Sequence, residues 1–268
     1  MKRFVLSAPP NAEGMIRLYD KDYHYLARVR RLKPGVCFDA LLPNGAAVQI
    51  RVLSTVDKIL IGECLALPGS DVTECVNSRV PAEQAFSGRL PPLALFQGLP
   101  KGSKMDLIVR QAAEGAVSII APFESEYSTT RAGADKLKRW ERIIKEARQQ
   151  SGSATQTLVK PPSDLDALLD YWREIKKEYE RPVGILLHQE PLEKGSFHDY
   201  IRCNPDFVAL AVGPEGGFSP REVSLFLAAG FKPLLLGNTI LRVETAALYG
   251  TAALRIILLE SESWTPKG

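Results

Sequence analysis

Residues 211–222 read AVGPEGGFSPRE: an apolar run ends in a Gly-Pro-Glu-Gly-Gly loop, and a new helix follows. Ser219 suits a helix N-cap, Pro220 suits the first helical position, and Glu222 completes the spacing of a capping box. Glycines in such a loop let the backbone approach a ligand closely and leave amide groups free to bind it. A plain strand-to-helix turn also favours glycine, but three glycines and a proline within residues 213–217 favour a ligand-binding loop.

A second loop of this kind occupies residues 234–247, which read LLLGNTILRVETAA. Arg242 and Glu244 stand where a long final helix begins. A cation beside a helix N-terminus opposes the helix dipole and gains nothing locally. We therefore expect Arg242 to face a ligand or RNA; the alternative is a solvated arginine paired with Glu244. A third and weaker candidate is residues 185–191, ILLHQEP, where His188 and Glu190 are polar at a strand end, an arrangement that is more often structural.

The flanking sequence alternates between apolar runs and helical patterns from residue 93 onward. The expected strands are Leu93–Phe96, Val117–Ala121, Val183–Leu187, Phe207–Val212 and Pro233–Leu236. The expected helices are Ser103–Glu114, Asp135–Gln150, Ser163–Glu178, Pro220–Ala229 and Val243–Leu259. This alternation predicts an α/β domain whose parallel sheet is covered on both faces and binds ligands at the carboxyl ends of its strands. The pattern alone predicts an unknotted doubly wound sheet, because knots are rare.

The first part of the chain has a different pattern. Short strands are expected at Val36–Leu42, Ala46–Leu53 and Lys58–Leu65, separated by turn signals, so residues 1–75 are expected to form a small β-barrel domain. A short helix over Asp22–Leu32 is expected before these strands. Residues 76–92 are rich in proline with little periodicity and are interpreted as a linker, which leaves residues 93–268 as the second domain.

Charge is distributed unevenly along the chain. The net charge is only +3 and the pI about 8.6, which does not by itself indicate nucleic acid. Arg28, Arg30, Arg31 and Lys33 nevertheless cluster without an acid, and residues 130–160 hold eight Lys/Arg against three Asp/Glu, a local net charge of +5. Two such patches favour a polyanion partner, although either one alone could be a solvated face.

Several protein classes are not expected. The four cysteines, Cys37, Cys64, Cys75 and Cys203, form no C-x-x-C pair and have no nearby histidine cluster, which disfavours a metal site or disulfide framework. No apolar run suits a signal peptide or a membrane span, so a cytoplasmic protein is expected. The glycines of residues 213–217 do not match the dinucleotide fingerprint G-x-G-x-x-G, and no phosphate-binding loop is present.

Together, residues 212–219 and 236–247 closely resemble the RsmE family of SPOUT-superfamily RNA methyltransferases. His24–Gly35 resembles the family's N-terminal PUA-like RNA-binding barrel, Lys101–Asp106 the start of its catalytic domain, and Trp140–Gly152 the next helix. The resemblance implies a trefoil-knotted SPOUT methyltransferase domain preceded by a PUA-like β-barrel, and a homodimer. It also implies an enzyme of ribosome biogenesis that transfers a methyl group from S-adenosylmethionine to N3 of a decoding-region uridine in 16S rRNA of the small ribosomal subunit.

The resemblance further implies a cofactor held bent within the three strand-end loops. The implied cofactor-binding residues are Leu187, His188, Gly213, Pro214, Glu215, Gly216, Gly217, Leu236, Gly237, Asn238, Ile240, Leu241, Thr245 and Ala246. The residues expected to bind RNA are Arg28, Arg31, Lys33 and Lys104, and no metal is expected. Uracil N3 must lose its proton before it attacks, so Arg242 is expected to face a uracil oxygen or a phosphate, and Glu244 to orient Arg242 or act as the base.

The sequence departs from the family's pattern in three places. Gly115-Ala116 replaces Leu-Gly, and Tyr127 and Ser153 each replace an arginine on the face expected to meet RNA. These changes leave open an RNA-binding ribosome-assembly factor with an impaired methyltransferase site. A ribose 2′-O-methyltransferase of the same superfamily is a second alternative. A Rossmann-type enzyme acting on a small molecule is a third, which the missing fingerprint and the basic N-terminal region disfavour.

Overall fold

A computed structural model of the 268-residue chain describes residues 4–65, 90–129, 134–189 and 196–264. Internal contacts divide the chain into two compact units. One comprises Met1–Ser87 with Arg148–Gln156, and the other Gly88–Ala147 with Thr157–Gly268. The linker expected at residues 76–92 lies mostly outside the described residues, and the expected domain boundaries stay predictions.

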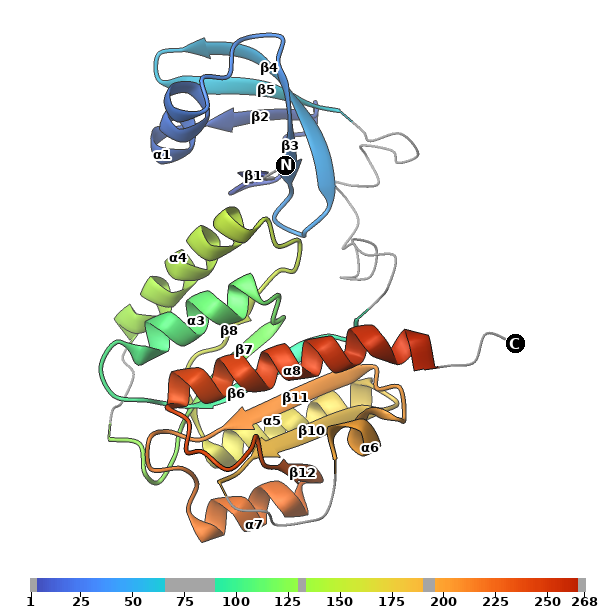
Figure 1. Cartoon of the computed structure of the whole chain (residues 1–268). Coiled ribbons are helices and arrows are strands. Elements are labelled where there is room, and N and C mark those ends of the chain that lie inside the picture. Colours follow the sequence, from blue (N-terminus) through green and yellow to red (C-terminus); the bar gives the residue numbers. More distant parts are fainter. Residues whose placement is uncertain (1–3, 66–89, 130–133, 190–195, 265–268) are drawn as a thin grey trace. The chain divides into compact units, whose positions relative to one another are not determined.

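The N-terminal unit is built on a five-stranded sheet in the order β1-β3-β4-β5-β2 (Figure 1). Its strands are β1 (Phe4–Val5), β2 (Met15–Leu18), β3 (Cys37–Leu41), β4 (Ala47–Val56) and β5 (Ile59–Leu65). β3, β4 and β5 pair antiparallel and coincide with the three strands expected from sequence. Phe4, Phe38, Ile50 and Leu60 point to one side and form the core of this unit. Closure of the sheet into a PUA-like barrel stays a prediction.

The segment expected to be one short helix over Asp22–Leu32 takes a different form. A single turn, α1 (Asp20–Tyr23), continues into a π-helix, η1 (His24–Val29), which Leu26 anchors in the core. Arg31 follows η1 with φ +54°, a left-handed backbone that few residues other than glycine adopt. The expectation of one regular helix to Leu32 is therefore wrong. Composition could not reveal this, because side chains that suit an α-helix also suit a π-turn.

The C-terminal unit contains a seven-stranded sheet in the order β12-β10-β11-β6-β7-β8, with β9 also paired to β7. Its strands are β6 (Leu93–Gly98), β7 (Ile119–Glu124), β8 (Leu158–Val159), β9 (Ser163–Asp164), β10 (Pro182–Leu187), β11 (Phe207–Val212) and β12 (Phe231–Leu234). Every pairing is parallel, which confirms the predicted parallel α/β sheet.

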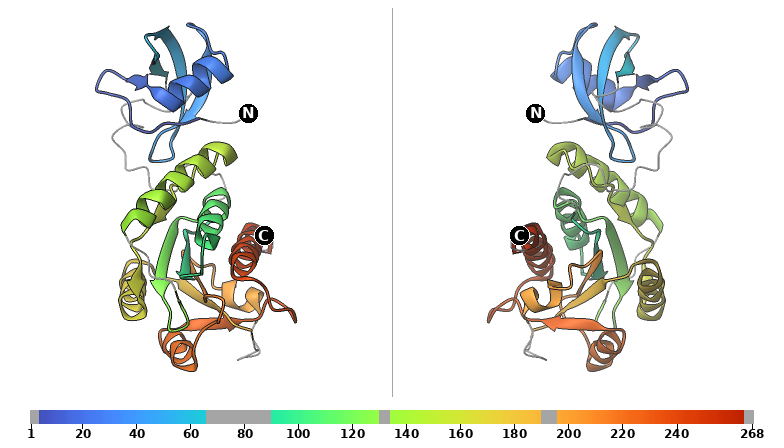
Figure 2. Two further views of the ribbon diagram at one scale, coloured as in Figure 1. Left: turned by 90° about the vertical axis from the view of Figure 1, so that its left-hand side faces the viewer. Right: turned by 90° about the vertical axis from the view of Figure 1, so that its right-hand side faces the viewer.

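Helices cover both faces of this sheet, and Figure 2 shows α5 and α8 on opposite sides of it. The helices are α3 (Lys104–Glu114), α4 (Ala134–Ser151), α5 (Leu165–Glu178), α6 (Phe197–Ile201), α7 (Pro220–Ala228) and α8 (Val243–Trp264). One apolar cluster joins α3, α4, α6 and α8 to the sheet. The other joins α5 and α7 and is rich in aromatic rings such as Phe96, Trp172 and Phe231. Among the described residues, no helix has both the length and the apolar composition needed to cross a membrane.

The strand order fixes where a ligand can bind. β11 lies between β10 and β6, so strands that are distant in sequence end side by side; Val212 at the end of β11 is in register with Gln97 of β6. The strand order reverses between β6 and β11, because the chain runs from β6 outward to β7 and later continues on the other side of β6. In open parallel sheets, ligands bind at the carboxyl ends beside such a switch point.

Candidate functional site

A pocket of about 790 Å³ opens at the carboxyl ends of β10, β11 and β12. Its wall is made by three loop segments, residues 187–189, 212–218 and 235–243, together with residues from α7, α8 and the start of α3. Small-molecule and cofactor pockets commonly measure roughly 300–1,000 Å³. The three strand ends singled out in the sequence therefore meet around one space that suits a ligand of nucleoside size.

Most of the sequence-predicted site residues line this pocket. They are Leu187, His188, Gly213, Pro214, Glu215, Gly216, Gly217, Leu236, Gly237, Asn238, Ile240, Leu241, Ala246, Arg242 and Lys104. Thr245 and Glu244 do not line it. The wall also includes Gln189, Phe218, Leu235 and Thr239, which the sequence reasoning passed over. Each of these is next to a predicted residue, so taking each loop as a continuous segment would have found them.

The loop of residues 213–217 is folded tightly on itself. Gly217 N donates to Pro214 O at 2.9 Å, and Gly217 has φ +72°. A Cβ added at Gly213 would lie 2.9 Å from the carbonyl carbon of Gly217, closer than such atoms approach in proteins. Glycine at these two positions is thus required by the turn, which keeps the backbone of the loop at the pocket wall.

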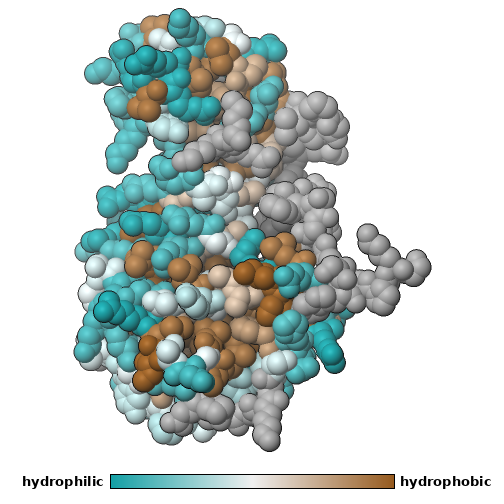
Figure 3. Space-filling model, viewed as in Figure 1, coloured by the Kyte–Doolittle hydropathy of each residue, from teal (hydrophilic) through white to brown (hydrophobic). Residues whose placement is uncertain are grey.

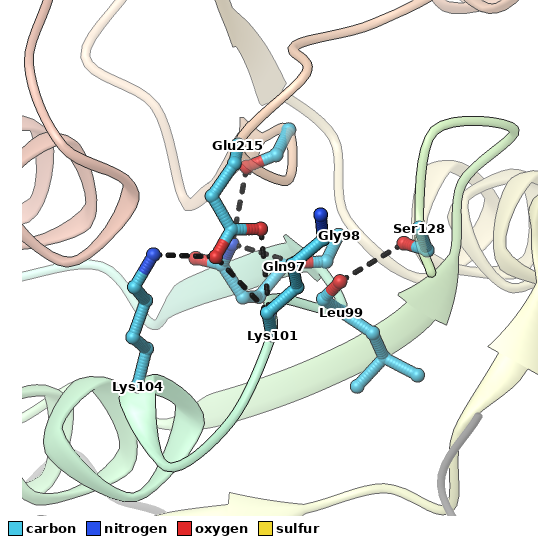
Figure 4. Close-up of polar contacts among 8 residues, drawn as sticks. Gln97, Gly98, Leu99, Lys101, Lys104, Ser128 and Glu215 are labelled. Carbon is cyan, nitrogen blue, oxygen red and sulfur yellow. Dashed lines mark hydrogen bonds and ion pairs between the residues drawn. The ribbon is translucent and has the colours of Figure 1, made fainter. Parts of the chain in front are cut away.

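Glu215 uses its carboxylate to hold two loops together. It accepts a hydrogen bond from Lys101 N at 3.1 Å and from Lys104 Nζ at 2.6 Å (Figure 4). Partial burial acts to raise the pKa of Glu215, but the hydrogen bonds from Lys104 and from backbone amides outweigh it and lower that pKa below its usual value. Glu215 is therefore a carboxylate at neutral pH, and it ties the loop between β6 and α3 to the pocket wall.

Gln97, at the end of β6, makes a second link beneath the same loop. Its side chain is fully buried, and Nε2 donates to Gly98 O at 2.9 Å and to Val212 O and Gly213 O at 3.4 Å each. Oε1 is buried and accepts no hydrogen bond from the residues that the structure describes. Gln97 thus fixes the carbonyl groups where β11 turns into the pocket loop. The sequence reasoning did not single out Gln97; the one sign of its role was a polar residue near the end of an otherwise apolar strand.

Glu222 confirms the predicted capping box and joins a further loop to it. Glu222 N donates to Ser219 Oγ at 3.1 Å, and Ser219 N donates back to Glu222 Oε2 at 2.8 Å. The carboxylate, which is almost fully buried, also accepts from Ser125 Oγ and Glu126 N, both at 3.0 Å. Residues 125–128, which follow β7, are therefore attached to the start of α7.

Arg242 and Glu244 occupy the expected place at the start of α8 but have different surroundings. Arg242 is exposed and lines the pocket, and its carbonyl accepts from Ala246 N at 2.8 Å. Glu244 is partly buried, and its Oε2 accepts no hydrogen bond from the described residues, Arg242 included. The structure thus does not support a pairing of Arg242 with Glu244.

The predicted RNA-binding cations of the N-terminal unit lie on its surface. Arg28 in η1, Arg31 just after it, and Lys33 are all exposed. Within the described part of the chain, no group of three or more His, Cys, Asp or Glu side chains is arranged to hold a metal ion.

Comparison with known proteins places these features in a family context. A family model described as an RNA methyltransferase domain matches residues 88–255. The ribosomal RNA small subunit methyltransferase E of Synechocystis is 30% identical over 259 residues, covering 96% of this chain and 78% of that protein. The protein of the same name from Bacillus subtilis is 29% identical over 246 residues, 87% of each chain. The crystal structure of the Neisseria gonorrhoeae enzyme of that name, bound to S-adenosyl methionine, is 26% identical with a TM-score of 0.74 and covers 96% of this chain and 98% of its own.

Proposed function

This chain belongs to the RsmE family of RNA methyltransferases, and we propose that it methylates N3 of a uridine in the decoding region of 16S rRNA. S-adenosylmethionine is its methyl donor, and small-subunit rRNA is its substrate class. The pocket formed by three strand-end loops carries this conclusion, because it brings the predicted cofactor residues other than Thr245 together around one space of suitable size.

The pocket wall fits the cofactor chemically. Leu187, Leu236 and Leu241 supply apolar surface suited to an adenine ring. The tight turn of residues 213–217 keeps backbone polar groups at the wall, where they suit hydrogen bonds to a ribose or a base. The sulfonium of S-adenosylmethionine supplies an already activated methyl group, so the protein's task is to bind, align and exclude water.

Arg242 is proposed to stabilise the negative charge that appears on the uracil oxygens when N3 loses its proton. It is the exposed guanidinium in the pocket wall, and a fixed cation beside a developing anion lowers the barrier. Glu244 lies outside that wall, which favours Arg242 over Glu244 as the residue that meets the base. The role of Glu244 as a proton acceptor or positioning residue stays a prediction.

Residues 1–75 are proposed to act as a PUA-like RNA-binding domain, joined by residues 76–92 to the catalytic domain, residues 93–268. Arg28, Arg31 and Lys33 would contact phosphates, which orient the RNA without reading its sequence. Lys104 would hold the RNA backbone at the pocket. We also propose that the catalytic domain contains the trefoil knot, on the ground of its membership of the RsmE family.

A homodimer is proposed because α8 leaves an apolar stripe uncovered. Leu248, Tyr249, Ile256 and Leu259 are exposed along this helix. Figure 3 shows apolar side chains gathered over the middle of this unit, where Figure 1 draws α8. A second copy that buries the stripe would remove this surface from water. We place the enzyme in the cytoplasm with the small ribosomal subunit.

Nucleoside analysis of the product tests the proposal against its rivals. Small subunits from cells lacking this gene would be incubated with the protein and methyl-labelled S-adenosylmethionine, and the RNA digested to nucleosides. Label in 3-methyluridine is the expected result. Label in a 2′-O-methyl nucleoside would favour the ribose-methylating alternative. Cofactor binding without any transfer would favour the assembly factor.

A further inference from the structure

Residues 125–128 carry an exposed aromatic side chain on a firmly held loop. Tyr127 is 48% exposed. Its neighbours on one side, Ser125 and Glu126, are bound to Glu222, as described above. On the other side, Ser128 Oγ donates to Leu99 O at 3.0 Å and Ser128 N donates to Ser125 O at 2.8 Å. The turn that carries the ring is therefore held in place, so less conformational entropy is lost when a ligand binds to the ring.

The ring lies directly against the pocket wall. A Cβ added at Gly216 would be 2.9 Å from Tyr127 Cβ and 3.3 Å from its Cγ and Cδ2. Gly216 itself lines the pocket. Only a residue without a side chain lets Tyr127 approach the loop this closely. One part of the aromatic side chain is thus packed against Gly216, and about half of Tyr127 is exposed, although Tyr127 itself does not line the pocket.

We propose that Tyr127 stacks on an unpaired nucleobase of the substrate RNA beside the pocket. A base that is to be methylated on its pairing edge must leave its helix and lose its stacking neighbours. A flat, pre-positioned ring next to the methyl-transfer pocket replaces part of that lost stacking. The neighbours of Tyr127 in the turn are polar, which favours a single flat ligand over an extended apolar protein surface. This inference rests on the proposed function because it takes RNA as the substrate.

Two substitutions separate the aromatic face from the other properties of Tyr127. Tyr127→Phe keeps the ring, whereas Tyr127→Leu keeps an apolar side chain of moderate size but removes the flat face. Stacking on one base is worth roughly five- to hundredfold in binding. We expect Tyr127→Leu to raise the KM for small ribosomal subunits by about that factor. Tyr127→Phe should stay within about twofold of the wild type. Affinity for S-adenosylmethionine, measured by calorimetry, and kcat at saturating RNA should be unchanged in both.

A fluorescence experiment tests stacking without requiring methyl transfer. In Tyr127→Trp the new indole should be quenched by a short oligouridine but not by an abasic oligonucleotide of the same length, after subtraction of the wild-type signal. Two quenching results would contradict stacking: equal quenching by both probes, or no quenching by oligouridine. Either result, combined with a wild-type KM for Tyr127→Leu, would overturn the inference while leaving the proposed function intact. Base-dependent quenching in a protein that methylates no rRNA would instead contradict the proposed function and support stacking.

Discussion

Lys104 Nζ lies 2.6 Å from Glu215 Oε1, and both residues line the same pocket although 111 positions separate them in sequence. Glu215 was expected from sequence to contact the cofactor. That contact stays a prediction. In the structure its carboxylate holds the loop between β6 and α3 against residues 213–217, and Lys101 N strengthens that link. The shape of the pocket should therefore depend on this ion pair.

Glu215→Gln should weaken S-adenosylmethionine binding by a few-fold. The variant keeps the backbone of the loop but loses the charge, and a partly exposed ion pair of this kind is worth about 1 kcal/mol or less. Calorimetric titration measures the change. Glu174→Gln is the matched control, because it removes an ion pair of 2.7 Å with Lys177 on the exposed face of α5. Equal affinity in Glu215→Gln and the wild type would show that the loop holds its shape without the pair.

The same ion pair predicts a pH dependence of stability. The pKa of Glu215 is lowered in the folded chain, so the carboxylate's contribution is complete above its ordinary pKa of 4.5 and is lost as the pH falls through the lowered folded pKa. The difference in Tm between the wild type and Glu215→Gln should be constant from pH 7 down to about pH 5 and shrink in stronger acid. A difference that grew on acidification would contradict this assignment.

Glu222→Ala should destabilise the fold by about 2–4 kcal/mol. It leaves Ser125 Oγ, Glu126 N and Ser219 N without their buried acceptor, and removal of one partner from a buried charged network is costly. Asp164→Ala is the control, since Asp164 caps α5 through one bond to Ala167 N and its loss should cost only about 1 kcal/mol. Denaturant unfolding compares the two. Similar losses of unfolding free energy in the two variants would mean that Glu222 contributes only through the capping box.

Much of this architecture is encoded locally and could be predicted. The strand Phe207–Val212 has the predicted bounds. The capping box of Ser219 and Glu222 could be predicted because it depends only on residues three positions apart. The links from Glu222 to Ser125 and from Lys104 to Glu215 span 97 and 111 residues. They depend on the position of β11 beside β6, which an alternation of strands and helices does not specify. The π-helix that carries Arg28 was missed for another reason, since its residues also favour an ordinary helix.

The exposed cations of the N-terminal unit should control the salt dependence of RNA binding. Each phosphate contact removed should reduce the slope of log K against log salt concentration by about 0.7–0.9. Arg28→Gln and Arg31→Asn test this; asparagine tolerates the left-handed backbone at position 31. Lys58→Asn is the control, because Lys58 is exposed in the same unit and has a similar left-handed backbone (φ +60°), but lies in the turn between β4 and β5. If Arg28→Gln and Arg31→Asn both keep the wild-type slope, as the control should, phosphate contact by Arg28 and Arg31 is excluded.

The central claim is that this pocket delivers a methyl group to N3 of one uridine with the help of Arg242. Primer extension on small subunits from cells lacking the gene tests it most directly, because a methyl on N3 blocks Watson–Crick pairing and stops reverse transcriptase. With the wild type and S-adenosylmethionine we predict one new stop at a decoding-region uridine. With Arg242→Ala we predict little or no stop at equal cofactor affinity. No stop with the wild type would contradict the proposed reaction, and an undiminished stop with Arg242→Ala would contradict the role of Arg242.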